Sequence, residues 1–438
     1  MGTLHNLGAV SLLGMDTELY QDHILDWLGS SPDNLNGLFS SHRWLQEGVE
    51  PWKLKLWARE SIEPAMGRAP IVVLVFVGLW YINLVLLDHN KVNFAGVLGI
   101  KTPASAFTMY CGVIMAILYT VTMLLFVQMA GSTIELAITF FYGMLVIFIM
   151  TLAQPGFAGL APAEAHLVEN RSTFFRLCRN VIWPGQTIAF AEIVFADALT
   201  SMSKVFKDAA ITIIAVYSNV SQTPITDLHE EGMLLVAVLA SVPFLIRVRQ
   251  CWVQFEGQHD PLLKVPIFLN IVKYMSAFPP IWLAAAATLG YYNRNMPLYI
   301  MLTTAVNSTY SFVWDIVMDW GFISFSRTGK CGTRQRFFYP LVTYLFVGVS
   351  NLVLRFAWAA NKLAFFSGMD AASLVLCLEL VEVFRRSVWN MYRIEWEIIS
   401  VEARGRNVSK EDLGADSSPS EGDLSPAVRS GSSASLRV

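Results

Sequence analysis

Apolar segments recur along the chain from about residue 69 onward, and most of them are roughly 20 residues long, the length of helix that crosses about 30 Å of hydrocarbon. Each segment therefore predicts a transmembrane helix. The fourth is too long for one simple span and is expected to tilt, kink or break. The pattern predicts an all-α, polytopic membrane protein with about nine spans, within a range of about eight to ten. The segments are 69–88, 106–130, 134–153, 187–218, 232–249, 265–290, 297–319, 337–360 and 366–390.

Composition supports a membrane protein and excludes several other classes. The chain of 438 residues is 54% hydrophobic and only 15% charged, whereas a soluble domain has about 25% charged residues. A net charge of −3 gives no support for nucleic-acid binding. The five cysteines are scattered without a CxxC pair, which argues against a disulfide scaffold or a zinc site. No metal and no other cofactor is expected.

The two ends of the chain differ from the apolar middle. Residues 1–68 are moderately polar and are expected to form a juxtamembrane segment of short amphipathic helices. Residues 401–438 become rich in Ser, Gly and charge, and from residue 403 they contain no aromatic side chain. Such a composition buries too little apolar surface to fold. It predicts a disordered tail that transport does not need.

Lys and Arg residues indicate the orientation, because short positively charged loops favour the cytosol. Three predicted loops are basic, and with nine spans they share a side with the tail. We therefore expect the tail in the cytosol, although a basic cluster before the first span, at Lys53, Lys55, Arg59 and Arg68, favours the opposite orientation. The loop residues are Arg171, Arg176 and Arg179; Arg247, Arg249 and Lys264; and Arg327, Lys330, Arg334 and Arg336.

Charged and polar side chains inside the apolar segments are the main functional signal. An ionisable group there costs on the order of 3 kcal/mol or more, and by default it marks a pathway or a partner. Together these residues predict a polar central pathway. They are Glu192, Asp197, Thr200, Lys204, Lys207 and Asp208; Lys273 and Tyr274; Asp315 and Asp319; Arg355, Trp358 and Lys362; and Glu379, Glu382, Arg385, Arg386 and Arg393.

Some of these charges have a simpler explanation. Lys362, Arg393, Glu395 and Glu397 lie towards segment ends, which favours side chains that extend to the interface. For the adjacent Arg385 and Arg386, binding and this interfacial role both stay open. Arg355 lies inside its segment, with Trp358 nearly one turn later, which favours a functional role.

Asp315 and Asp319 are four residues apart, so they are expected on one face of a helix. Arg and Lys in a polar cavity suit an anion, and the guanidinium fork matches phosphate oxygens in pairs. Carboxylates hold such cations in place, and they accept a hydrogen bond from a protonated oxyanion such as HPO₄²⁻ or H₂PO₄⁻. We therefore expect the two Asp to orient basic residues of neighbouring spans, and one of them to contact the substrate.

Three motifs carry a resemblance to a known family: WDIVMDWG (314–321), RFAWAANK (355–362) and EVFRRSVWNMYRIEWE (382–397). In that order and spacing they resemble the EXS family, which includes eukaryotic phosphate exporters and fungal ER-retention-defective proteins of the Golgi. FADALTSMSKVFKD (195–208) and NIVKY (270–274) fit as well. The resemblance covers about residues 69–398. It implies peripheral scaffold helices over 69–153 and a transport core over 154–400.

The resemblance implies a transporter of inorganic phosphate and no enzyme. Because only 68 residues precede the first span, the chain is similar to the short members without an SPX module. For these, the family implies a multi-pass protein of the Golgi membrane that moves phosphate from the lumen to the cytosol. It would recycle the phosphate released by glycosylation, and so support the retention of glycosyltransferases and of ER proteins. Besides phosphate and the lipid bilayer, Golgi glycosyltransferases are implied as partners. The resemblance is also compatible with a homodimer.

Carried over by motif, the phosphate pathway would use ten residues. Thr200 stands where the exporters commonly have Asn, and the basic run that follows Gln–Cys in the family is WVQFEGQ here. Two other functions stay open: a sorting adaptor that binds glycosyltransferase tails without transport, and a membrane enzyme acting on a phospholipid. The ten residues are Asp197, Thr200, Lys273, Tyr274, Asp315, Asp319, Arg355, Trp358, Arg385 and Arg386.

Overall fold

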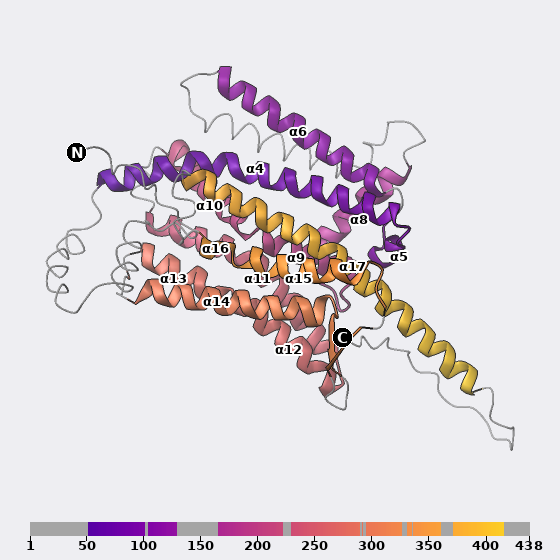
Figure 1. The fold of residues 1–438 in the computed structure, drawn as a ribbon. Coiled ribbons are helices and arrows are strands. Elements are labelled where there is room, and N and C mark those ends of the chain that lie inside the picture. Colours follow the sequence, from indigo (N-terminus) through magenta and orange to yellow (C-terminus); the bar gives the residue numbers. More distant parts are fainter. Residues whose placement is uncertain are drawn as a thin grey trace.

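The computed structural model describes residues 51–100, 104–128, 165–221, 229–289, 291, 295–325, 331–334, 336–360 and 371–415. This part of the chain is almost wholly helical, which confirms the all-α prediction (Figure 1). The helices are α4 (Pro51–His89), α5 (Phe94–Leu98), α6 (Ala104–Gln128), α8 (Ala165–Ile182), α9 (Phe190–Ser201), α10 (Ser203–Ser221), α11 (His229–Gly257), α12 (Pro261–Met275), α13 (Phe278–Thr288), α14 (Met296–Trp314), the π-helix η5 (Asp315–Asp319), α15 (Leu341–Arg355), α16 (Ala357–Ala360) and α17 (Ala371–Ala415).

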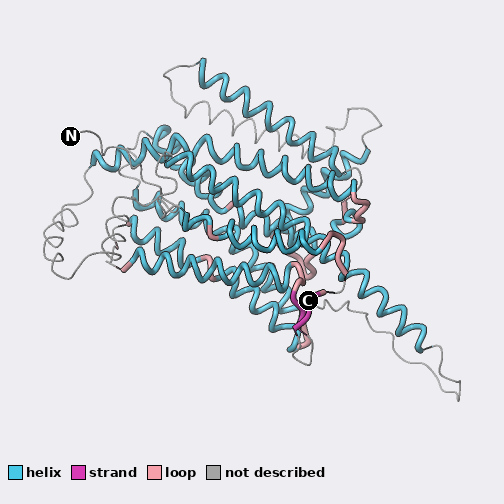
Figure 2. Tube along the Cα trace, in the orientation of Figure 1, coloured by secondary structure: helices cyan, strands magenta, loops and turns pink. Residues whose placement is uncertain are grey.

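Strand structure within the described residues is limited to one short hairpin, which Figure 2 shows at one end of the helical bundle. It pairs β1 (Ile323–Phe325) with β2 (Cys331–Thr333) in antiparallel register, with Ser324 opposite Gly332. The hairpin follows η5 directly and leads towards α15, so it connects two elements that carry predicted site residues.

Three helical stretches in the described part are long and apolar enough to cross a membrane: Gly67–His89, Glu231–Gly257 and Pro261–Thr288. Two shorter apolar helices cover Ser105–Val121 and Leu341–Arg355. α6 and α15 also expose many large apolar side chains, as helices that face lipid do. The protein is therefore a multi-pass membrane protein. The count of nine spans stays a prediction, and the span predicted at 134–153 lies outside the described residues.

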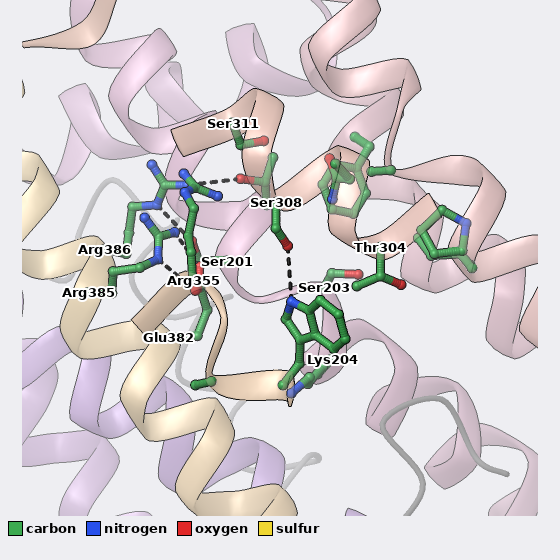
Figure 3. A pocket seen from close by; sticks show the side chains of 18 of the residues that line it. Ser201, Ser203, Lys204, Thr304, Ser308, Ser311, Arg355, Glu382, Arg385 and Arg386 are labelled. Carbon is green, nitrogen blue, oxygen red and sulfur yellow. Dashed lines mark hydrogen bonds and ion pairs between the residues drawn. The ribbon is translucent and has the colours of Figure 1, made fainter. Parts of the chain in front are cut away.

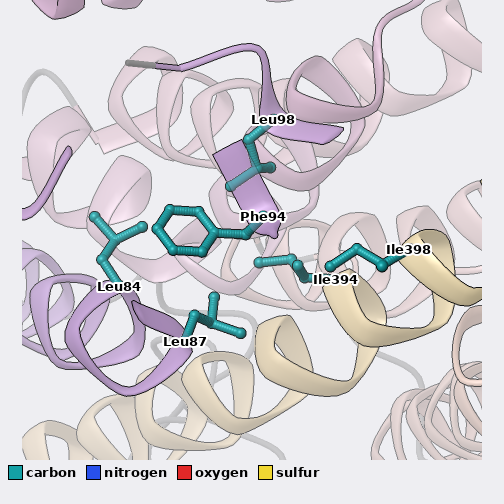
Figure 4. Packing of buried hydrophobic residues seen from close by; sticks show 6 residues of the cluster. All are labelled: Leu84, Leu87, Phe94, Leu98, Ile394 and Ile398. Atoms are coloured by element: carbon teal, nitrogen blue, oxygen red, sulfur yellow. The ribbon is translucent and has the colours of Figure 1, made fainter. Parts of the chain in front are cut away.

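The long helices α4 and α17 pack along each other, and α10 packs against α4 on one side and α11 on the other. At one end of this layer, a small core joins α4, α5 and α17. Figure 4 shows its six buried side chains, which are Leu84, Leu87, Phe94, Leu98, Ile394 and Ile398. A hydrogen bond from the Asn83 amide to the Ser387 carbonyl (3.0 Å) fixes the same two long helices further along. α17 is therefore held firmly where its arginines begin.

Four predicted spans are interrupted rather than continuous. The fourth breaks at Met202 between α9 and α10, as its length predicted, and α12 and α13 separate at Ser276 and Ala277. The seventh changes from α14 to a π-helix at Asp315, and the eighth breaks at Phe356. Interrupted spans commonly carry the binding site in membrane transporters.

Two segments differ from what the sequence predicts. α17 continues to Ala415, past residue 401 where the disordered tail was expected to begin, and Arg404 there donates to Glu397 (3.0 Å). The basic residues 171–179 and 247–249 lie in helices α8 and α11 instead of loops. Residues 1–50 of the predicted juxtamembrane segment, residues 416–438 of the tail, and Arg327 and Lys330 lie outside the described residues.

Candidate functional site

A cavity of about 340 Å³ lies where the helix breaks meet, and all ten predicted site residues line it. α9 supplies Asp197 and Thr200, and the end of α12 supplies Lys273 and Tyr274. η5 contributes Asp315 and Asp319, and the break after α15 places Arg355 and Trp358. The middle of α17 adds Arg385 and Arg386. Residues from distant parts of the sequence thus form one polar chamber.

Asp315 is the most fully bonded carboxylate of the cavity. Its Oδ2 accepts from Arg355 (Nη2 at 2.5 Å, Nε at 3.2 Å) and from the Asn351 amide (3.0 Å). Its Oδ1 accepts from the Trp389 indole (3.0 Å). The Arg385 guanidinium lies 3.7 Å away and donates to Asn351 Oδ1 (3.1 Å). Because its acceptor capacity is taken up by the protein, Asp315 orients the two arginines, as expected.

Asp319 lies in a different environment, because the backbone between the two acids is a π-helix. The Trp320 amide donates to the Asp315 carbonyl (2.9 Å), five residues back, and such wide turns often occur at functional sites. Asp319 faces Lys273 Nζ at 3.9 Å and Arg393 Nε at 3.8 Å, and its Oδ2 accepts no hydrogen bond from the described residues. The two acids therefore hold different partners, where a shared helix face was expected.

The glycine of the WDIVMDWG motif has a structural explanation. Gly321 adopts φ +57°, and a Cβ on it would lie 2.5 Å from the Trp396 ring. A side chain at this position would meet backbone strain and a direct clash together. Gly321 thus lets the chain leave the π-helix tightly against α17, and so fixes the place of Asp319.

Asp197 is held from two sides. The Tyr274 hydroxyl donates to its Oδ1 (2.5 Å), and Arg247 Nε lies 2.8 Å from the same oxygen. Arg247 is 2% exposed, donates to Gln250 and covers the Tyr274 ring at 4.8 Å. The prediction that Arg247 supplies charge in a cytosolic loop is therefore wrong. Its position within α11 and its buried acid partner make it a support of the cavity.

Arg386 differs from the other arginines, because no carboxylate lies within ion-pairing distance of it among the described residues. Its Nε donates to Ser201 Oγ (2.7 Å) and its Nη2 lies 3.5 Å from Thr200 Oγ1. Its guanidinium covers the Trp389 ring at 4.5 Å. Figure 3 shows Arg386 beside Arg385, whose guanidinium is held by Glu382 (2.5 and 2.8 Å). Arg386 thus presents a buried positive charge that neutral hydroxyls hold in place.

Hydroxyl groups and apolar side chains line the rest of the cavity. The Trp358 indole donates to Ser308 Oγ (3.1 Å), a contact drawn in Figure 3, where Ser311 and Thr304 lie on the same helix, α14. Six cationic side chains and five carboxylates line the cavity, so its net charge is +1 when all are ionised. The cations are Lys204, Lys207, Lys273, Arg355, Arg385 and Arg386, and the carboxylates are Asp197, Asp315, Asp319, Glu379 and Glu382.

Two interfacial assignments are wrong. Glu395 is 1% exposed and accepts from Arg334, Tyr344 and the Phe338 amide, because it lies at an inward position of α17. Arg393 lies beside Asp319 and covers the Phe190 ring at 4.7 Å, so it does not extend to an interface. Lys362, assigned the same role, lies outside the described residues.

Sequence reasoning also missed supporting residues of the site. Asn351, which bridges Asp315 and Arg385, lies one turn before Arg355, and that spacing alone could have indicated a shared face. Ser201, the partner of Arg386, offered no comparable signal, because a serine next to a helix break is common.

Comparisons with known proteins agree with these motifs. The EXS family matches residues 64–399, most of the chain. Protein ERD1 homolog 1 of Schizosaccharomyces pombe is 33% identical over 242 residues, which cover 52% of this chain and 62% of the relative. Solute carrier family 53 member 1 of Homo sapiens is 26% identical over 283 residues (58% and 38%). Phosphate transporter PHO1-2 of Oryza sativa subsp. japonica is 26% identical over 245 residues (54% and 29%). The chain thus spans less than two thirds of the length of these curated relatives.

Proposed function

The chain belongs to the EXS family, and from this premise and the chemistry of the cavity we propose that it transports inorganic phosphate across a membrane. One relative bears the name of a phosphate transporter and another that of a solute carrier, which supports the proposal. The protein would act as a transporter and not as an enzyme. The ten predicted residues would form its phosphate pathway.

The observation that carries the proposal is the state of Arg386. A guanidinium buried at 6% exposure is costly unless a partner compensates its charge. The protein supplies only hydroxyl acceptors to Arg386 at close range within the described residues. The cavity beside it is lined by hydroxyls, by further cations and by carboxylates that lie beyond ion-pairing distance of Arg386. A small oxyanion in that space would accept the remaining donors of Arg386.

Phosphate suits this cavity better than sulfate does. At neutral pH phosphate keeps at least one proton, which it can donate to a carboxylate, whereas sulfate has none. Asp319 has an oxygen that accepts no hydrogen bond from the described residues, and it lies near Lys273, which donates none to them. An acid acceptor and a cation in the same cavity as Arg386 thus provide for both the charge and the proton of phosphate.

We further propose that transport runs from the Golgi lumen to the cytosol. This direction would recycle phosphate released during glycosylation, and it would support the retention of glycosyltransferases and of ER proteins. The resemblance of the motifs to the short, ER-retention-defective members and the match to protein ERD1 homolog 1 support this placement, together with the multi-pass architecture. Sealed Golgi vesicles that carry the protein would export luminal radiolabelled phosphate faster than vesicles without it. Equal rates would contradict the direction.

The test of transport itself is radiolabelled phosphate flux through the purified protein in sealed liposomes, with sulfate as competitor. We expect flux that excess sulfate competes with weakly. The alternative, an adaptor that binds glycosyltransferase tails, requires binding without flux, and a phospholipid enzyme requires a chemical product. Phosphate that stays outside while tails bind would overturn the transport proposal in favour of the adaptor.

A further inference from the structure

A second group of charges lines the cavity, at the beginning of α10. Lys204 and Lys207 both lie among its lining residues, and their separation of three positions places them on one face of the helix. In Figure 3, Lys204 lies apart from Arg385 and Arg386. Both lysines therefore belong to the same chamber as the arginines, and Lys204 lies in another part of it.

Neither lysine donates a hydrogen bond or forms an ion pair with any residue that the structure describes. Lys204 interacts with Glu379 and Glu382 only through longer-range electrostatics, and Lys207 does so with Asp208 and Glu379. Both lysines are half-buried, whereas a fully buried lysine almost always has a partner. Two ammonium groups with free donors thus face the cavity.

Glu379 completes the group from the opposite helix, α17. It is 3% exposed and lines the cavity, yet neither carboxylate oxygen accepts a hydrogen bond from the described residues. Arg68 lies 3.3 Å from its Oε1, but the guanidinium of Arg68 is already committed to Asp208 by two hydrogen bonds (2.8 and 2.6 Å). Glu379 is therefore a buried carboxylate that forms an ion pair with Arg68 but accepts no hydrogen bond from the described residues.

Charge counting shows which ligand would fit. When all five groups are ionised, Arg68, Lys204 and Lys207 carry three positive charges and Asp208 and Glu379 carry two negative ones, so the group is left with one positive charge. Glu382 is not counted, because it is paired with Arg385. We propose that Lys204, Lys207 and Glu379 form a second oxyanion site, which takes a protonated phosphate ion of single charge. The lysines would donate to its oxygens, and its P–O–H group would donate to Glu379.

This site deepens the proposed transport function and rests on it. A second phosphate bound in the same chamber would lower the affinity of the arginine site for the first ion by charge repulsion. Several weak sites in sequence allow an ion to enter and still leave. The preference for a protonated ion would come from Glu379, which offers a negatively charged acceptor that repels sulfate.

The test counts bound phosphate. Radiolabelled inorganic phosphate is titrated against the purified full chain in lipid nanodiscs, and the number of ions bound per chain is measured by equilibrium dialysis. We expect two ions for the parent protein and one for the double variant Lys204→Gln/Lys207→Gln. The double variant Lys204→Arg/Lys207→Arg keeps both charges and should restore two. Lys264→Gln removes a lysine outside the cavity and should also leave two.

The outcomes separate this inference from the proposed function. If the parent binds one ion, which Arg386→Met removes and the lysine variant does not, the second site is refuted and the transport proposal stands. If the parent binds no phosphate, both fail. A thermal unfolding transition shows whether each variant is folded. If the glutamine variant does not fold, the arginine variant still tests whether two positive charges at these positions are enough to bind the second phosphate.

Sulfate competition in Glu379→Gln tests the role of this carboxylate, because a purely structural role would leave the competition unchanged. The amide removes the negative charge that excludes sulfate, so sulfate should displace the second phosphate from Glu379→Gln at concentrations at least tenfold lower than from the parent. Equal sulfate competition in the two proteins would overturn the assignment of Glu379 as the acceptor of the phosphate proton.

Discussion

Arg334 and Arg386 are equally buried, each with 6% of its surface exposed, but their surroundings differ. Arg334 donates to Glu395 (3.0 Å) and to the Trp320 carbonyl (3.2 Å). Four aromatic rings surround its guanidinium at 4.6 to 5.7 Å. Arg386 has hydroxyl partners and one ring, and it borders the cavity.

This comparison separates two uses of a buried cation. The charge of Arg334 is balanced within the protein by Glu395, whose Oε1 also accepts from the Tyr344 hydroxyl (2.6 Å) and the Phe338 amide (2.9 Å). Arg334 Nε and Glu395 Oε2 have no hydrogen-bond partner among the described residues, but both charges are paired. This network is closed in charge, fixes the hairpin to α17 and needs no ligand to balance it. The charge of Arg386 has no acid partner at close range in the described residues, so it is available to an ion that enters. Burial alone does not mark a functional arginine.

The largest expected effect is on folding, at Arg334. Arg334→Met would leave Glu395 buried without its cation, and removing one partner of a buried ion pair costs about 3–5 kcal/mol. We expect a strongly lowered melting temperature in detergent and little folded protein. Phosphate flux per folded molecule should be unchanged. A variant that melts with the parent would show that the closed network does not hold the hairpin.

Arg386→Met should have the opposite profile. Among the described residues it leaves no acid behind within ion-pairing distance, so the melting temperature should change little. Loss of a charge-assisted contact to phosphate costs about 1.5–3 kcal/mol, or roughly ten- to a hundredfold in flux at low phosphate. The measurement is radiolabelled uptake by liposomes at matched amounts of folded protein. Flux equal to that of the parent would show that Arg386 does not bind phosphate and that it is a structural residue like Arg334.

Arg355 lies between these two extremes, because it lines the cavity and also pairs with Asp315. Arg355→Lys keeps the charge but loses the paired geometry of Nε and Nη2. We expect a loss of flux of about tenfold, with stability close to that of the parent because Asp315 keeps Asn351 and Trp389. Kinetics over a range of phosphate concentrations check this. Parent-like flux would make Arg355 a purely structural residue.

The sequence predicted the members of the cavity better than their pairing. Charges within apolar segments are expensive, so Asp197, Lys273 and Arg385 stand out from the hydrophobic pattern alone. Which acid holds which cation depends on the helix breaks and on the π-helix, whose extra residue per turn no side-chain pattern reveals. Arg355 therefore pairs with Asp315, and Arg385 bonds to Glu382, one turn before it.

The helix ends and the burial of Glu395 were the least predictable features. A sequence shows that Glu395 lies beyond the apolar stretch, but its burial depends on Arg334, more than 60 residues earlier and brought near by the hairpin. Likewise α17 extends to Ala415 through polar residues whose composition favours disorder, and the Arg404–Glu397 pair forms only once the helix exists. Tertiary contacts decide both cases.

The smallest expected effect is at Arg336, two residues after Arg334 and paired with Glu402. Here both side chains are exposed, at 47% and 44%. Solvent screens an exposed pair, and fixing two long side chains costs entropy, so such pairs contribute about 0–1 kcal/mol. Arg336→Gln should therefore change neither the melting temperature nor the flux measurably. Both substitutions remove an arginine charge from the same short segment, and the two sites differ in burial and in the number of partners that hold the side chain. A marked loss of stability in Arg336→Gln would mean that removing any arginine charge from this region destabilises the fold. The instability expected of Arg334→Met could then no longer be assigned to its buried network.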